Sequence, residues 1–246
     1  MDYASPADDD SAVRDYSDPE WMAAKRGLLN YRRALIFQII FSIIAAVVGV
    51  GVGMSGVSGG SIEGILTFAF IVALIGAVLT AWMVYGLGLF AKVPEETGGR
   101  GLATVAVVFA AIGLLVQLYA TYQFSRIAFG GGIGMQGLIE MSESHWTTIS
   151  RLGSLIGFIC LLVALRRVAV HVGAYHVRDM IGSFVVIVII IIGLALLTAL
   201  VPLAPIVLLG GLALLVLAIV ALVKFLRIIE ALGNAIGGLD VSKVFD

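Results

Sequence analysis

Residues 34–91 form a run of 58 residues with a single formally charged side chain, Glu63. A hydrocarbon core about 30 Å thick is crossed by about 20 apolar residues in a helix, so this run has room for two crossings and a turn. Soluble domains carry about 25% charged residues, whereas this chain is 13% charged and 61% hydrophobic. The sequence therefore predicts a protein whose main solvent is lipid.

The same pattern continues along the chain and predicts six hydrophobic spans, each long enough to cross a bilayer with some tilt. These spans are expected to be helices, because a lipid-exposed backbone must satisfy its own hydrogen bonds and the two-residue alternation of a membrane barrel strand is missing. We therefore expect an all-α fold, a polytopic membrane bundle of six transmembrane helices. The spans cover residues 34–54, 64–91, 101–124, 151–175, 181–201 and 204–228.

Three segments flank this six-helix domain, which we place at residues 34–229. Residues 1–17 are acidic and aperiodic, which is typical of a disordered tail. Residues 18–33 open with a helix-start signal and combine apolar and basic positions at helical spacing. They predict an amphipathic helix that lies at the membrane interface before the chain turns into the bilayer. Residues 230–246 are expected to form a short C-terminal tail.

Lysine and arginine are divided unequally between the two sides of the predicted membrane. Of the 15 in the chain, 13 fall on the side that holds both termini, and the other two are Arg126 and Arg151. The positive-inside rule assigns the side richer in these residues to the cytoplasm. We therefore expect a multi-pass protein with both termini cytoplasmic.

The predicted spans have no Asp, Glu, Lys, Arg or His near their midpoints. Ion pumps and proton-coupled carriers keep such residues at membrane depth, because their function needs them. The sequence also lacks a catalytic triad pattern, a metalloprotease motif and a phosphate loop. We therefore predict that the chain is not an enzyme and has no catalytic, cofactor-binding or metal-binding residues. A net charge of -1 gives no reason to expect a nucleic-acid partner.

Three groups of residues are candidate contacts. Basic side chains at the inner ends of the spans suit anionic lipid headgroups or an acidic partner segment, or they only anchor the topology. Weakly polar side chains of the first and third spans would line a cavity between those helices. Paired small residues let helices approach closely. The basic candidates are Arg32, Arg33, Arg166, Arg167, His171 and Arg178; the cavity candidates are Gln38, Gln117, Tyr119 and Gln123; the packing glycines are Gly49, Gly53, Gly153 and Gly157.

The longest connection, residues 125–150, holds Glu140, Glu143 and His145 on the outer side of the predicted membrane. These three side chains lack a fourth metal ligand and any known site spacing, so a solvated polar loop is the preferred interpretation. A sensor function would have to use this loop, because the other outer turns are too short to form a pocket.

Residues 93–103 (VPEETGGRGLA) and 165–173 (LRRVAVHVG), together with residues 21–28, carry a family resemblance. With these motifs the chain resembles a group of uncharacterised six-span polytopic membrane proteins of bacteria such as myxobacteria and planctomycetes. The similarity covers most of the chain beyond the tail. It implies a location in the bacterial inner (cytoplasmic) membrane and no established activity.

The function expected from these observations is that of a non-enzymatic scaffold or structural component of the membrane. The alternative is a small-molecule or lipid transporter or channel, with a weakly polar cavity between the first and third spans. The expected partners are membrane lipids, together with a second copy of the chain or another membrane protein. A filled bundle would favour the scaffold, whereas a deep, polar-lined cavity between the first and third spans would favour transport.

Overall fold

The computed structural model describes residues 18–57, 62–130, 145–200 and 204–237. This part of the chain holds six α-helices, one short 3-10 helix and no strand. All six α-helices are long and apolar enough to cross a membrane, which confirms the predicted polytopic helical bundle. The elements are α1 (Pro19–Val57), α2 (Ile62–Phe90), η1 (Glu95–Thr97), α3 (Arg100–Gly130), α5 (His145–His171), α6 (Tyr175–Leu200) and α7 (Ala204–Ile236).

Some sequence predictions fall outside the described residues. These are the acidic tail over 1–17, the carboxylates Glu140 and Glu143 of the longest connection, and the last part of the C-terminal tail, 238–246. The first part of that tail, from residue 230 on, is helical in the structure, because α7 runs on to Ile236.

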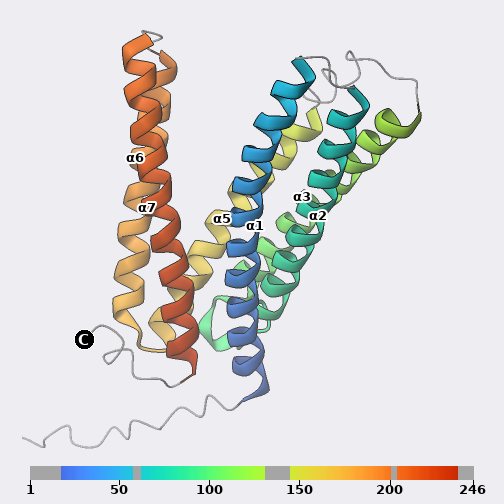
Figure 1. Cartoon of the computed structure of the whole chain (residues 1–246). Coiled ribbons are helices and arrows are strands. Elements are labelled where there is room, and N and C mark those ends of the chain that lie inside the picture. Colours follow the sequence, from blue (N-terminus) through green and yellow to red (C-terminus); the bar gives the residue numbers. More distant parts are fainter. Residues whose placement is uncertain (1–17, 58–61, 131–144, 201–203, 238–246) are drawn as a thin grey trace, which may run out of the picture.

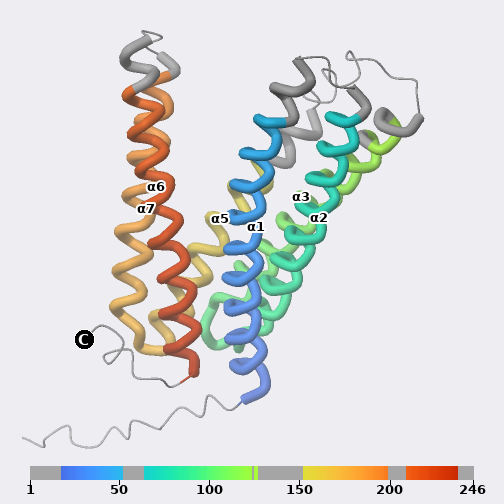
Figure 2. The backbone as a smooth tube through the Cα atoms, in the orientation of Figure 1, coloured from blue at the N-terminus to red at the C-terminus, as the bar shows by residue number. Residues whose placement is uncertain are grey.

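The six helices converge at one end of the molecule and diverge toward the other (Figure 1). Four of them form one arm, in which α1 packs on α2, α2 on α3 and α3 on α5. The second arm is the α6–α7 hairpin, which contacts the first arm through the α5–α6 and α1–α7 pairs. The start of α1 and the end of α7 lie at the same end of the molecule (Figure 2). We call this the basic end, because the α2–α3 connection and the α5–α6 turn bring Lys92, Arg100, Arg166, Arg167 and Arg178 there.

The buried core lies near the basic end. Its fully buried members include Leu28, Phe90, Leu165, Ile228 and Leu232, which come from α1, α2, α5 and α7. Farther along the helices, large apolar side chains are exposed instead, as in Val47 at 69% and Leu209 at 65%. Burying apolar surface is favourable only where that surface would otherwise contact water. A protein in a bilayer therefore needs a buried core near the basic end, whereas its helices can expose apolar side chains to lipid elsewhere.

The first helix differs from the prediction of a separate interfacial helix over 18–33. The structure has one continuous helix of 39 residues from Pro19 to Val57, about 58 Å long at 1.5 Å per residue. Trp21, Ala24 and Leu28 are buried in the protein core, whereas in an interfacial helix they would contact lipid. The expected turn near residue 33 does not form, since no proline or glycine interrupts the helix there. The basic end of α1 therefore extends beyond the length needed to cross a bilayer.

Two glycines allow α1 and α2 to cross closely. A Cβ added to Gly86 would lie 2.7 Å from the backbone nitrogen of Tyr31, and one added to Gly27 would lie 2.6 Å from the carbonyl oxygen of Gly86. Atoms this close would have to move, so the crossing depends on the missing side chains. Gly27 is not among the packing glycines selected from the sequence, because the small residue four positions before it is Ala23 and not a second glycine.

The selected glycines lie in α1 and α5. A Cβ on Gly157 would lie 2.9 Å from Cβ of Phe109, and one on Gly153 would lie 3.1 Å from Cδ1 of the same ring, so these two glycines receive Phe109 of α3. Gly49 leaves ordinary space, with Phe68 Cε1 at 3.6 Å from an added Cβ. Gly53 is helical, and its surroundings lie outside the described contacts.

Candidate functional site

A cavity of about 540 Å³ lies inside the four-helix arm. Its wall is built by one residue of α1 and by several residues each of α2, α3 and α5. Most of the lining is apolar, with Met83, Val84 and Leu87 from α2 and Phe158 and Leu161 from α5. The volume falls within the range of about 300 to 1,000 Å³ that is typical of ligand pockets. Space and lining together suit an apolar molecule of modest size.

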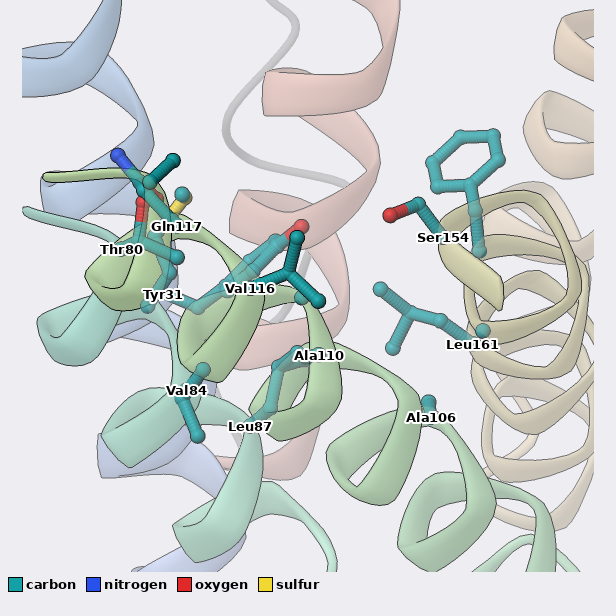
Figure 3. Close-up of a pocket in the computed structure, with 15 residues that line it drawn as sticks. Tyr31, Thr80, Val84, Leu87, Ala106, Ala110, Val116, Gln117, Ser154 and Leu161 are labelled. Carbon is teal, nitrogen blue, oxygen red and sulfur yellow. The ribbon is translucent and has the colours of Figure 1, made fainter. Parts of the chain in front are cut away.

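Four polar side chains also reach this cavity: Tyr31, Thr80, Gln117 and Ser154. Thr80 and Gln117 lie together on one side, and Ser154 lies across from them with its hydroxyl directed inward (Figure 3). The Thr80 hydroxyl is already used, because it donates to the carbonyl oxygen of Gly76 at 2.9 Å. The Gln117 carboxamide offers donors and an acceptor to a ligand, and a hydroxyl such as that of Tyr31 can serve as either.

A weakly polar cavity was predicted between the first and third spans, and only one of the four candidate residues lines the observed cavity. Gln117 is in the wall, whereas Gln38 is not. Tyr119 is exposed on the outer face of α3, and its hydroxyl accepts a hydrogen bond from Nε2 of Gln123 at 2.8 Å. These two residues are one turn apart, and neither of them lines the cavity. Thr80 and Ser154 were not among the predicted cavity residues, since a single hydroxyl in an apolar helix does not indicate which neighbouring helix it faces.

Gln38 has a different environment. Its Oε1 atom is buried and has no hydrogen-bond partner among the described residues. Its backbone carbonyl accepts from the Ser42 hydroxyl at 2.7 Å, one turn along α1. A buried amide oxygen without a hydrogen-bond partner costs free energy, so Gln38 lowers the stability of the first arm.

The cavity lies on the side of the first arm that faces α7. Tyr31 and Phe158, which line it, also contact the ring of Phe225 on α7, with ring centroids 6.4 and 5.5 Å apart. Phe225 in turn stacks on Phe184 of α6 at 5.4 Å. This aromatic cluster joins the two arms. The α6–α7 hairpin diverges from α1 toward the end opposite the basic end (Figure 1).

A second hollow, of about 550 Å³, lies at the basic end on another face of α5. We call it the basic hollow; its lining residues are Thr97, Val163, Arg166, Arg167, Val170, His171 and Arg178. Four of the six basic candidates from the sequence, Arg166, Arg167, His171 and Arg178, therefore share one site. The α5–α6 turn makes this possible, because Gly173 adopts φ 76° and lets Arg178 of α6 return beside the end of α5.

The other two basic candidates lie elsewhere. Arg32 on α1 forms an ion pair with Glu230 of α7, with Nη2 and Oε2 2.8 Å apart. Arg33 is exposed on α1 and is not part of either lining. The partner Glu230 is a residue that the sequence analysis did not select, because nothing local in the sequence links it to a position 198 residues earlier.

The connection between α2 and α3 forms one wall of the basic hollow. The Thr97 hydroxyl donates to the carbonyl oxygen of Pro94 at 2.8 Å and accepts from the backbone N–H of Gly99 at 3.0 Å. Gly98 has φ 61° and its carbonyl oxygen accepts from Nη1 of Arg167 at 2.9 Å. These bonds fix the connection against α5, so the motif at 93–99 is a structural link that positions one arginine of the hollow.

Among the described residues no group of three or more His, Cys, Asp or Glu side chains is placed to hold a metal ion. Cys160 is a free, half-buried thiol on α5. No protein-family model, no curated protein and no solved structure matches the chain. The two sites are therefore interpreted from their geometry and chemistry.

Proposed function

We propose that this protein is a non-enzymatic multi-pass membrane protein that binds an apolar small molecule or a lipid chain in the cavity of its first arm. The observation that carries the proposal is the cavity of about 540 Å³, walled by four helices and lined mainly by apolar side chains. Such a lining gives affinity through apolar contact, and a few convergent polar groups orient the ligand. Gln117 and Ser154 would fulfil the second role.

The position of the cavity supports uptake from the membrane. Its lining residues Tyr31 and Phe158 contact Phe225 of α7, and the two arms diverge toward the end opposite the basic end (Figure 1), so a molecule dissolved in the bilayer would enter between the arms. The described cavity wall contains no ionisable group apart from the Tyr31 phenol. This lining suits a lipid-like or other neutral ligand and argues against an ion as cargo, since a bare ion needs polar ligands.

The test is mass spectrometry of what remains bound after purification in mild detergent. Gly113→Leu would fill the cavity, because an added Cβ at Gly113 meets only Ser154 Oγ at 3.8 Å and points into the lining. Gly193→Leu is the matched control, since nothing lies within 4 Å of an added Cβ there. We expect a stoichiometric apolar molecule in the wild type and in Gly193→Leu, and its loss in Gly113→Leu. Equal retention in all three proteins would contradict the proposal.

The second candidate is the scaffold function expected from the sequence. The observation that favours it is the divergence of the α6–α7 hairpin, which leaves apolar faces such as Ile189 and Leu212 uncovered by this chain. A partner membrane protein or a second copy would cover them. Co-purification of a stoichiometric protein, with an empty cavity in the same sample, would select the scaffold over the ligand-binding function.

We further propose that the protein lies in a bacterial inner membrane with its basic end in the cytoplasm. The unequal distribution of lysine and arginine supports this orientation. A reporter that is active only in the cytoplasm, fused after Asp246, should be active in cells. Activity of a periplasm-specific reporter at the same position would overturn the orientation without affecting the cavity.

A further inference from the structure

We propose that the basic hollow is a binding site for a phosphate group, carried either by an anionic lipid headgroup or by a soluble phosphate compound. The site is separate from the cavity of the first arm: the two linings share no residue. The proposal rests on four features of the hollow, namely its charge, its unused hydrogen-bond donors, its rigidity and its apolar border.

The hollow carries an excess of positive charge. Three arginines line it, Arg166, Arg167 and Arg178, and His171 lies beside them. Within the described ranges, one ion pair involves these arginines: Oδ1 of Asp179 lies 3.0 Å from Nη2 of Arg178. Glu95, on the neighbouring connection, is instead paired with Arg100 at 3.3 Å. Like charges held together favour an anion from outside the chain, because it lowers their mutual repulsion.

Many hydrogen-bond donors in the hollow remain available. A guanidinium has five N–H donors in a planar fork that matches phosphate oxygens. Arg167 uses one of its donors toward the Gly98 carbonyl oxygen, and Arg178 uses Nε and Nη2 toward Asp179. For the Arg166 side chain, no hydrogen bond or ion pair occurs within the described part of the chain. The three arginines therefore offer more donors than the protein itself satisfies.

The hollow is also held in a fixed form. Arg167 is tethered to the α2–α3 connection through Gly98, and the guanidinium of Arg178 lies over the Tyr175 ring with its central carbon 5.5 Å from the centroid. The α5–α6 turn is closed by a hydrogen bond from the Ala174 N–H to the Ala169 carbonyl oxygen at 2.8 Å. Prearranged donors bind an anion with less loss of conformational entropy than flexible ones.

The border of the hollow is apolar on one side. Val163 and Val170 belong to the lining and are exposed, and Val163 precedes the arginines on α5 by one turn toward the membrane interior. A lipid could place its phosphate against Arg166 and Arg178 and its chain along Val163. This placement makes the headgroup source the one that the structure favours, although a soluble phosphate would use the same donors.

The test uses the full-length protein in nanodiscs and compares two double variants with the same change of charge. Arg166→Gln with Arg178→Gln removes two guanidinium groups from the hollow and leaves Arg167 on Gly98. Arg33→Gln with Arg227→Gln is the control, because both arginines are exposed at the basic end and outside the hollow. Arg33→Gln alone and Arg227→Gln alone show whether either control position matters.

Two probes distinguish the sources of phosphate. Retention of phosphatidylglycerol over phosphatidylcholine is measured by native mass spectrometry, and the melting temperature is measured in phosphatidylcholine nanodiscs with and without inorganic phosphate at constant ionic strength. We expect the hollow variant to weaken binding about tenfold or more, with the control variant close to wild type. If the hollow variant loses only the retention of phosphatidylglycerol, the hollow is a headgroup site. If it loses the shift of melting temperature caused by inorganic phosphate, the hollow binds a soluble ligand. Binding of neither probe, or equal losses in both double variants, would overturn the proposal.

Discussion

The guanidinium of Arg32 donates through Nη2 to Oε2 of Glu230 at 2.8 Å, which joins the first helix to the last across 198 positions of sequence. Nearby, Leu29 packs on Gly233, so the ion pair belongs to a crossing of α1 and α7 at the basic end. Both side chains are partly exposed, at 30% for Arg32 and 44% for Glu230. This exposure limits the free energy of the pair, because water screens it.

Replacing Glu230 with methionine should destabilise the protein more than replacing both partners does. The single variant leaves the Arg32 guanidinium, whose Nε is already buried without a partner, beside an apolar surface. We expect a loss of about 0.2 to 1 kcal/mol for Glu230→Met and recovery of most of it in Arg32→Met with Glu230→Met. Thermal unfolding in detergent measures both. A double variant that is less stable than the single one would contradict this account of the pair.

Gly86→Ala should destabilise the α1–α2 crossing, and Gly88→Ala should not. The added methyl group at position 86 would lie 2.7 Å from the Tyr31 backbone nitrogen, whereas position 88 has nothing within 4 Å. Overpacking of this kind costs about 1 to 3 kcal/mol, and alanine in place of an unconstrained helical glycine gains up to about 1 kcal/mol. The two variants should therefore shift the melting temperature in opposite directions. Equal shifts would mean that the crossing tolerates a methyl group.

Thr97→Val should loosen the α2–α3 connection, and Thr97→Ser should preserve it. Valine keeps the shape of the side chain but removes the hydroxyl, which leaves the Pro94 carbonyl oxygen and the Gly99 N–H without this partner. Thr97 is only 7% exposed, so water does not replace the lost bonds readily and the cost should be about 1 to 3 kcal/mol. Hydrogen exchange of the Gly99 amide is the most direct measurement, with faster exchange in Thr97→Val alone. Unchanged exchange would show that another bond protects this amide.

The features of the fold that depend on one helix at a time were predictable from the sequence. The lack of charge in each span sets helix number and approximate length, and the prolines and glycines after Phe90 and Leu200 mark the turns. Contacts between helices were less predictable, since a stripe of valine, leucine and isoleucine faces lipid or protein equally well. The aromatic cluster around Phe225, the pairing of Arg32 with Glu230 and the close approach at Gly27 are examples. In each case the partner is far away in the sequence and carries no local signal.

The candidate sites follow the same division. The basic hollow was partly predictable, because Arg166, Arg167, His171 and Arg178 are close in sequence and the turn at Gly173 brings them together. The cavity was not, because its wall combines four helices whose rotation about their axes determines which side chains face inward. Gln117 lines the cavity, while Tyr119 and Gln123, two and six residues later, do not and bond to each other instead.

The last prediction concerns the separation of the two arms. The described contacts between α1 and α7 lie near the basic end, as in Tyr31 with Phe225 and Arg32 with Glu230. Spin labels at Arg33 and Arg227, in a Cys160→Ala background, should therefore give a narrow distance distribution. Labels at Val47 and Leu212, which are exposed farther along the same helices, should give a longer and broader one, because the described side chains provide no contact between the arms there. A short, narrow distribution for this second pair would mean that the arms close in the membrane, and the cavity would then be shut off from lipid.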